Sequence, residues 1–318
     1  MTFKVIKLAL DLYRNMTKNT YIPPTAKEIA KRQDENDSLR SLLAQRKLYS
    51  KAKYWLSLRL IGMGAIAFLA PIIAFIWPQS AVIVGAVSGA WIFFGRTLFS
   101  NLEKGLSSKA AAVQEMFDVH VFKMPHLADR TPVPTLEEIA VITGADNAIA
   151  KQAKDEKLLE WYAVNPSDSG ITTVAICQRT NTSYSKSLLN TTSKVWLGLI
   201  VFWSLILVVV SIYLQLSLNT FILAVMLPLL PPFLDKWEFR KGFKKAESQR
   251  DAMTKEIESK INNNSVNSSD LLVWQSRMYD LRRDMPLVPD KVYSFMRNIN
   301  EKAMKVATRQ LSDKSRGN

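Results

Sequence analysis

Two long stretches of this chain carry no charged side chain. The first covers residues 60–95 and the second residues 195–234, which are 36 and 40 residues. A helix needs about 20 apolar residues to cross the hydrocarbon core of a bilayer. Each stretch is nearly twice that length, and tilting a single helix cannot absorb the excess. Each stretch must therefore fold back once. This predicts two membrane hairpins rather than two hairpins buried in the core of a large soluble protein.

The middle of each stretch contains residues typical of a turn. Pro78 interrupts the first within Trp77–Ser80 (WPQS), and the segment 215–219 (QLSLN) interrupts the second. The fold class predicted is a mostly α integral membrane protein with four transmembrane helices in two hairpins and a largely helical cytoplasmic domain. The predicted spans are 55–77, 79–99, 194–214 and 217–234. The predicted division is 1–54 (cytoplasmic N-terminal helical segment), 55–99 (first hairpin), 100–193 (cytoplasmic middle segment), 194–234 (second hairpin) and 235–318 (cytoplasmic C-terminal helical segment).

The distribution of charge predicts the orientation. The chain has 42 Lys and Arg against 28 Asp and Glu, a net charge of +14. Residues 1–59 contribute +8, residues 96–194 contribute zero and residues 235–318 contribute +6, whereas both hairpin turns are uncharged. Because Lys and Arg concentrate on the cytoplasmic side, both termini and the middle segment are expected there. The basic residues are then expected to contact the lipid bilayer surface, and no DNA or RNA partner is predicted.

Within residues 60–95 and 195–234 the predicted spans carry no Asp, Glu, His, Lys or Arg, which argues against a carrier or a pump. Small residues at four-residue spacing allow close helix packing, within one subunit or between subunits. Mildly polar serines could line a pore, which would need several subunits and therefore a homo-oligomer. The packing candidates are Ala81, Gly85 and Gly89, and the pore-lining candidates are Ser88, Ser204 and Ser211.

Outside the spans the sequence predicts helices, and capping residues mark where several of them begin or end. Thr25 with Glu28 and Thr135 with Glu138 have capping-box spacing, and Gly144 is a plausible stop for the second of these helices. A further helix is expected through residues 158–162, whereas residues 171–179 fit either a helix or a strand. The tail is expected to form helices at 235–261, near 270–284 and from about residue 290.

The sequence offers little for catalysis. It has no phosphate-binding glycine loop, no nucleophile elbow and no His-Glu-x-x-His motif. His120 and His126 flank Pro125 at a spacing that does not suit a helical pair of metal ligands, and Cys177 has no His partner nearby in the sequence. We therefore expect no enzyme activity, no catalytic residue, no metal and no cofactor.

Several strings of residues follow one another in a characteristic order around the two hairpins. They are Ile29-x-x-Arg32-Gln33, the stretch Leu42 to Lys53 (LLAQRKLYSKAK), Phe117-Asp118-Val119-x-Val121-Phe122, Glu160-Trp161-Tyr162, Ile176-Cys177-Gln178-Arg179, and Arg282 with Pro286-x-Val288-Pro289-Asp290-x-x-Tyr293. Because these strings occur in this order, the chain resembles the SMODS-associated four-transmembrane family of pore-forming effectors over nearly its whole length.

This resemblance implies a membrane effector of bacterial antiphage defence in the inner membrane. A cyclic oligonucleotide messenger would bind the cytoplasmic part, and the oligomeric membrane part would form a pore or disrupt the membrane, causing abortive infection. Phosphates and bases favour Arg forks and aromatic faces. The ligand-binding candidates are Arg32, Gln33, Gln45, Arg46, Trp161, Tyr162, Gln178, Arg179, Arg282 and Tyr293.

Other interpretations stay open at this point. Each ligand-binding candidate could instead serve helix packing or a buried polar network. The protein could be a non-gated membrane scaffold that recruits a soluble partner. A membrane-anchored enzyme acting on lipid or nucleotide would depend on Asp118 or Cys177.

Overall fold

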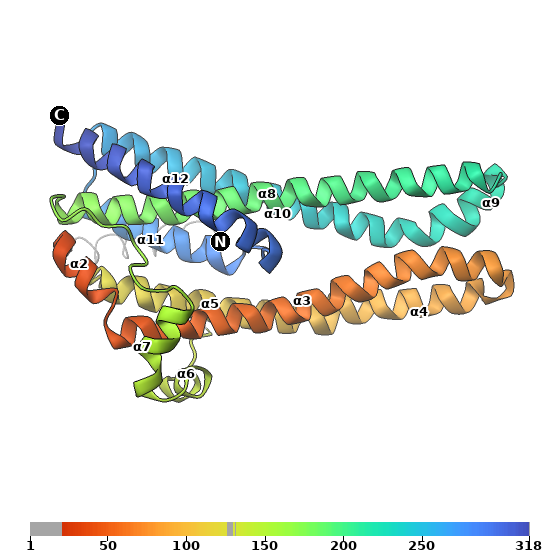
Figure 1. The fold of residues 1–318 in the computed structure, drawn as a ribbon, viewed down its shortest axis with the longest axis horizontal. Coiled ribbons are helices and arrows are strands. Elements are labelled where there is room, and N and C mark those ends of the chain that lie inside the picture. The colour runs from red at the N-terminus through yellow and green to blue at the C-terminus, as the bar shows by residue number, and fades with distance from the viewer. Residues whose placement is uncertain (1–20, 126–129, 131, 318) are drawn as a thin grey trace, which may run out of the picture.

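The computed structural model describes residues 21–125, 130 and 132–317, and these residues form helices and connecting segments without a strand. The predicted mostly α fold is therefore confirmed. Two pairs of long helices, α3 with α4 and α8 with α10, lie side by side and extend from a wider bundle (Figure 1). The helices are α2 (Ala26–Arg32), α3 (Asn36–Ile76), α4 (Ala81–Phe94), α5 (Ser100–Val121), α6 (Leu136–Thr143), α7 (Asp146–Asp155), α8 (Gly170–Tyr213), α9 (Leu218–Thr220), α10 (Leu227–Asn262), α11 (Ser268–Arg283) and α12 (Asp290–Gly317).

Both predicted turns are confirmed. α3 ends at Ile76, and a short 3₁₀ turn, η1 (Pro78–Ser80), leads into α4. In the second hairpin, Gln215 has a φ of 51°, and the Ser217 hydroxyl caps α9 by accepting from the Thr220 amide at 3.2 Å. One-turn π-helices, η2 (Gly95–Phe99) and η3 (Phe221–Met226), then join α4 to α5 and α9 to α10.

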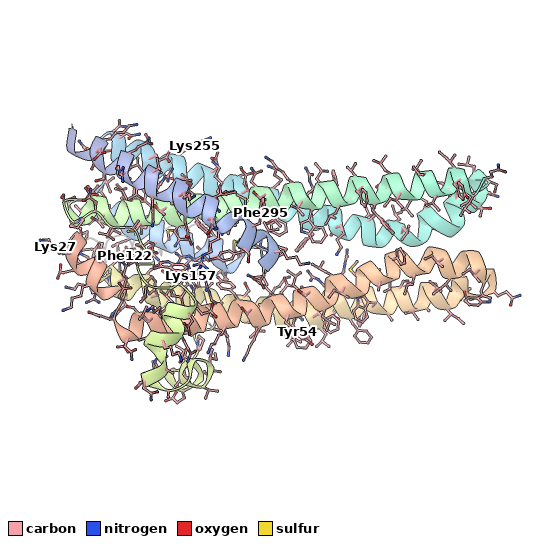
Figure 2. All side chains as sticks on the ribbon, in the orientation of Figure 1. Lys27, Tyr54, Phe122, Lys157, Lys255 and Phe295 are labelled. Carbon is pink, nitrogen blue, oxygen red and sulfur yellow. The ribbon has the colours of Figure 1, made fainter. Side chains whose placement is uncertain are left out.

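Among the residues that the structure describes, three helices are long and apolar enough to cross a membrane. They are Asn36–Ala70, Val82–Val121 and Gly170–Tyr213. Only about 20 residues of each fit into hydrocarbon, and their apolar parts coincide with predicted spans. Large apolar side chains there point outward, with Val82 82% and Ile212 71% exposed, and side chains fringe the outside of both hairpins (Figure 2). Residues 217–234 are divided among α9, η3 and the start of α10, so the fourth span stays a prediction.

Three of the long helices continue from the hairpins into the bundle without a break. α3 is 41 residues long, α8 is 44 and α10 is 36. Residues 171–179, which fitted helix or strand, form the first turns of α8, where the Ser169 hydroxyl accepts from the Thr172 amide. Gly170 is required here because a Cβ would lie 2.4 Å from the Pro24 carbonyl oxygen. We call the described residues of 21–59, 100–193 and 235–317 the polar bundle.

Both predicted capping boxes are present, and α6 ends at Gly144, which has a φ of 86°. The predicted helices of the tail are also confirmed as the second half of α10, α11 and α12. The core of the polar bundle joins α3, α5, α8 and α11 through residues such as Leu42, Phe117, Val174 and Trp274. The bundle therefore has a hydrophobic core of its own, separate from the apolar surface of the hairpins.

The predicted helix through residues 158–162 is wrong. α7 ends at Asp155, and the chain then runs without regular structure to α8, with positive φ at Lys157 (54°) and Glu160 (52°). Tertiary contacts hold this segment, because Leu158 and Tyr162 are buried and the Glu160 amide donates to Asp34 Oδ1 at 2.9 Å. Leu158 and Tyr162 are four residues apart and would share one face of a helix as well, so burial alone does not exclude the helix. The segment is irregular because backbone groups of Glu160 and Tyr162 bond to Asp34 and Gln33, and these tertiary contacts override the local preference.

Candidate functional site

A buried polar network lies at the centre of the polar bundle, around Asp118 of α5. Asp118 is fully buried, and its carboxylate accepts from the Tyr162 hydroxyl at 2.6 Å and from Gln275 Nε2 at 3.1 Å. Arg282 Nη1 lies 2.6 Å from Asp118 Oδ2. A buried charge is tolerated only when it is paired and hydrogen-bonded. This network therefore fixes α5, α11 and the segment before α8 against one another.

The network extends in two directions from Asp118. Glu115, one turn earlier on α5, accepts from Gln275 Nε2 at 2.7 Å, and Gln275 in turn accepts from Gln178 Nε2 at 3.0 Å. Burial raises the pKa of Glu115 to about 7, although the charge of Arg282 opposes this effect. On the other side, Gln33 exchanges two hydrogen bonds with the backbone of Tyr162, at 2.8 and 3.3 Å.

A second group of polar side chains lies where α12 crosses α3. Arg46 donates to Glu156 Oε2 at 2.8 Å and lies 3.4 Å from the Tyr293 hydroxyl. Lys53 pairs with Asp290 at 2.5 Å and lies over the Tyr293 ring, 5.7 Å from its centroid. We call these five residues the seam. The side chains of Glu156 and Asp290 are 52% and 68% exposed, so the ion pairs of the seam face water and are weak.

The structure thus places six of the ten ligand-binding candidates in two groups and the other four apart from them. Gln33, Tyr162, Gln178 and Arg282 meet in the buried network, and Arg46 and Tyr293 meet in the seam. The other four lie apart. Arg32 donates to the His120 carbonyl, Arg179 pairs with Glu258, Trp161 packs edge-on against Phe117, and Gln45 is buried with its Oε1 lacking a hydrogen-bond donor among the described residues.

Sequence reasoning missed several members of the buried network. Glu115, Gln275 and Arg130, which lies 3.6 Å from Glu115, are not among the ligand-binding candidates, and a chemical role for Asp118 appears only in the enzyme hypothesis. A signal was available, because Glu115 and Asp118 are three residues apart on one helix face and Gln275 and Arg282 are seven apart on another. Polar residues on the apolar face of an amphipathic helix are the pattern to look for.

The candidate residues of the hairpins have simple local contacts. Each of the three pore-lining candidates donates its hydroxyl hydrogen to the carbonyl four residues earlier, Ser88 to Val84, Ser204 to Ile200 and Ser211 to Leu207. A Cβ placed on Gly85 or Gly89 would meet nothing within 4 Å, and the side chain of Ala81 lies outside the described part. Within this chain α4 instead approaches α3 at Gly62, where a Cβ would lie 2.0 Å from the Trp91 ring.

Cavities open on the described part of the polar bundle. One of about 200 Å³ lies between the start of α8 and the ends of α10 and α12, and it is lined by uncharged residues such as Thr172, Asn264 and Ser315. Another, of about 10 Å³, lies beside Arg250 and Arg282. Among the described residues no group of three His, Cys, Asp or Glu could hold a metal ion. His120 lies 3.3 Å from Glu35, and His126 lies outside the described residues.

The model of the SMODS-associating 4TM effector domain matches residues 27–311. A probable CBASS effector molecule of Bacillus cereus (strain VD146) is 21% identical over 298 residues, covering 89% of this chain and 98% of the relative. No solved structure matches. Because the family model covers both hairpins and nearly all of the polar bundle, the chain belongs to the SMODS-associating 4TM effector family.

Proposed function

We propose that this antiphage effector binds a cyclic oligonucleotide messenger through its polar bundle on the cytoplasmic side of the bacterial inner membrane. The observation that carries the proposal is the continuity of α3, α8 and α10 between bundle and hairpins. A rigid helix transmits a change of packing at one end to the other end. A ligand that binds the active arrangement more tightly than the resting one shifts the population toward it.

The seam is the best place in the polar bundle for such a ligand. The members of the buried network are paired with one another away from water, whereas the ion pairs of Arg46 and Lys53 are exposed enough to exchange for a phosphate. Arg46 supplies a fork for a phosphate, and the Tyr293 ring supplies a face for a base. The seam also joins α3 to α12, and α12 packs against α8. A ligand inserted in the seam would therefore change how the helix pair of α3 and α4 contacts the pair of α8 and α10.

The response we propose is assembly into a pore, or disruption of the membrane, followed by death of the infected cell. Residues 60–95 and 195–234 of one chain carry no charged side chain that could line a conducting path, so such a path needs several copies. Gly85 and Gly89 form an open surface on α4 that allows a second copy to approach closely. Both termini would lie in the cytoplasm, as the excess of Lys and Arg predicts.

We also propose that the protein acts without catalysis. Asp118 and Cys177, on which an enzyme hypothesis would depend, are 0% and 2% exposed. Burial raises the pKa of the Cys177 thiol well above its usual range, which disfavours the reactive thiolate. Neither side chain can reach a substrate in the arrangement described.

Leakage from liposomes tests the gating proposal. Purified full-length protein is reconstituted with a trapped dye, and a panel of cyclic di- and trinucleotides is added. We expect one messenger to cause leakage and Arg46→Ala to weaken its effect about tenfold or more. Arg277→Ala is the matched control, because Arg277 forms a comparably exposed pair with Glu256 at 2.7 Å away from the seam. The proposal would be contradicted by leakage that occurs without a messenger, or by the absence of leakage when the cognate messenger is added.

The alternative is a scaffold that recruits a soluble partner. One observation favours it: α6 exposes Leu136 (75%) and Val141 (86%) on a lobe at the side of the bundle (Figure 1). Under this alternative the messenger causes no leakage, and a protein captured during infection is lost from the Val141→Ser variant. Capture together with unchanged membrane conductance would favour the scaffold over the pore.

A further inference from the structure

A small cavity lies where α8, α10 and α11 meet inside the polar bundle. Its polar lining comes from Asn181, Thr182 and Ser185 of α8, Arg250 of α10 and Arg282 of α11. Its volume of about 10 Å³ is close to the smallest that holds one water-sized occupant. The cavity therefore admits a single water or a single-atom ion, but not a phosphate group.

Arg250 lies in this cavity without a carboxylate partner among the described residues. It is 2% exposed, and its guanidinium donates to two backbone carbonyls, those of Ala246 at 3.2 Å and Leu281 at 2.6 Å. Backbone carbonyls satisfy hydrogen bonds but do not neutralise a charge. A buried cation that lacks a counter-ion costs several kcal/mol or more, so the structure leaves a charge here to be balanced.

Arg282 faces the same cavity and adds to the imbalance. It is 5% exposed, its Nη1 is engaged with Asp118, and its Nη2 has no hydrogen-bond acceptor in the described part of the chain. The carboxylate of Glu115, which lies 3.6 Å from Arg282, is shared with a further cation, Arg130, at 3.6 Å as well. Two guanidinium groups thus converge on one small space.

The protonation states increase the excess of positive charge. Burial and the neighbouring charge of Arg282 lower the pKa of Arg250 to about 10, so its side chain still carries a proton at neutral pH. Burial raises the pKa of Glu115 to about 7, which removes part of one negative charge. The Ser185 hydroxyl, which makes no hydrogen bond within the described structure, lies on the cavity wall as an additional donor.

We propose that this cavity is a buried site for a small monovalent anion of the halide class, held between Arg250 and Arg282. Such an ion balances the charge of Arg250 and accepts hydrogen bonds from donors on α8, α10 and α11. Its occupancy would hold these three helices together in the resting arrangement. The site is separate from the seam, and it does not depend on the messenger proposal.

Thermal unfolding of the full-length protein in detergent tests this proposal. The melting temperature is measured in sodium chloride, sodium bromide and sodium gluconate at equal ionic strength, because gluconate is too large for the cavity. A ligand that binds only the folded state raises the melting temperature, so we expect a rise of a few degrees in either halide. Arg250→Met should lose this difference, and in gluconate it should melt no lower than the wild type.

Arg179→Met is the control, since Arg179 is also largely shielded, with 12% of its side chain exposed, but pairs with Glu258 at 2.5 Å, and it should keep the halide dependence. Anomalous scattering from crystals grown in bromide should show a peak between the two guanidinium groups. This measurement uses wild-type protein, so it decides the matter even if Arg250→Met does not fold. An equal halide shift in Arg250→Met and wild type, or a bromide-free cavity, would overturn the proposal.

Discussion

At the scale of single residues, Asp118 matters most because it is the counter-ion of a buried arginine. Its carboxylate contacts Tyr162 from the segment before α8 and both Gln275 and Arg282 from α11. The residues that resemblance singled out for ligand binding near this point, Tyr162, Gln178 and Arg282, are engaged with the protein itself. Their first role is to hold the bundle together, and the exposed seam is left for recognition.

Asp118→Asn should destabilise the folded protein by about 3 kcal/mol, because removing one partner leaves Arg282 buried without its nearest counter-ion. Chemical denaturation in detergent measures the change. Glu258→Gln is the control, since Glu258 pairs with Arg179 at a partly exposed position and its loss should cost about 1 kcal/mol or less. Equal losses for the two variants would mean that burial does not determine the effect.

Glu115 predicts a pH dependence whose sign follows from its raised pKa. In the folded state the pKa is about 7, above its ordinary value of 4.5, so folding favours the protonated form. The contribution of Glu115 to stability is therefore fully present below pH 4.5 and is lost as the pH rises through 7, by about 3 kcal/mol in total. The melting temperature of wild type minus that of Glu115→Gln should fall between pH 5 and pH 8. A flat or rising difference would show that the Glu115 carboxyl is not shifted this way.

At the scale of elements, the hairpins are held together by specific close approaches as well as by apolar surface. Gly62 receives the Trp91 ring, whose Nε1 lies 3.4 Å from the Arg59 carbonyl. The helix pairs also contact one another through Phe68 and Trp203, whose ring centroids are 6.0 Å apart. Apolar composition predicts that a helix enters the membrane, whereas these contacts determine which helix lies beside it.

Gly62→Val should destabilise the first hairpin by about 1–3 kcal/mol, because the new side chain overlaps the Trp91 ring. The melting temperature in detergent measures this loss. Gly64→Val is the matched control on the same helix, since a Cβ there meets nothing within 4 Å. Adding Trp91→Ala should recover part of the loss, and additive losses in the double variant would refute the contact.

The continuity of α8 can be interrupted at Lys194, an exposed residue at the predicted membrane boundary. Lys194→Pro removes a helix hydrogen bond and introduces a kink, at a cost of about 3 kcal/mol. If α8 transmits the messenger signal, this variant should bind messenger within about twofold of wild type by calorimetry yet lose most leakage. Lys194→Ala should behave as wild type. Retained leakage in the proline variant would exclude α8 as the transmitting helix.

At the scale of the whole molecule, the protein has two unlike parts, the polar bundle and the hairpins. The polar bundle has its own core and charge network, whereas the hairpins expose apolar side chains over most of their length. One copy offers no path for ions through its predicted spans, so the proposed function belongs to an assembly. The open surface of α4 is where such an assembly would form.

Gly85→Leu with Gly89→Leu should block assembly and leakage, because bulky side chains keep a second helix away. Both positions are open in the single chain, so the melting temperature of the monomer should stay within about 1 °C of wild type. Chemical cross-linking in liposomes with messenger present measures assembly. Gly198→Leu, at an equally open position on α8, is the control. Unchanged cross-linking in the double variant would place the subunit contact elsewhere.

Local signals in the sequence were reliable where the residues themselves determine the structure. Pro78, in the uncharged WPQS segment at the middle of the first apolar stretch, directly follows the end of α3, and the Thr25 and Thr135 capping boxes need only residues three apart. The segment around Leu158 and Tyr162 was predicted wrongly for the opposite reason. Its path depends on Gln33 and Asp34, which are more than 120 residues away in the chain.

The sequence by itself determined that this chain has two apolar hairpins, where they turn and which ends carry the basic charge, because hydropathy, proline and charge act locally. Only the tertiary structure decided which polar residues are buried together. It separated Arg282, paired with Asp118, from Arg46, which is exposed at the seam, and it brought Arg250 to a cavity without a carboxylate. Desolvation and pairing depend on neighbours from distant helices, and no sequence spacing specifies them.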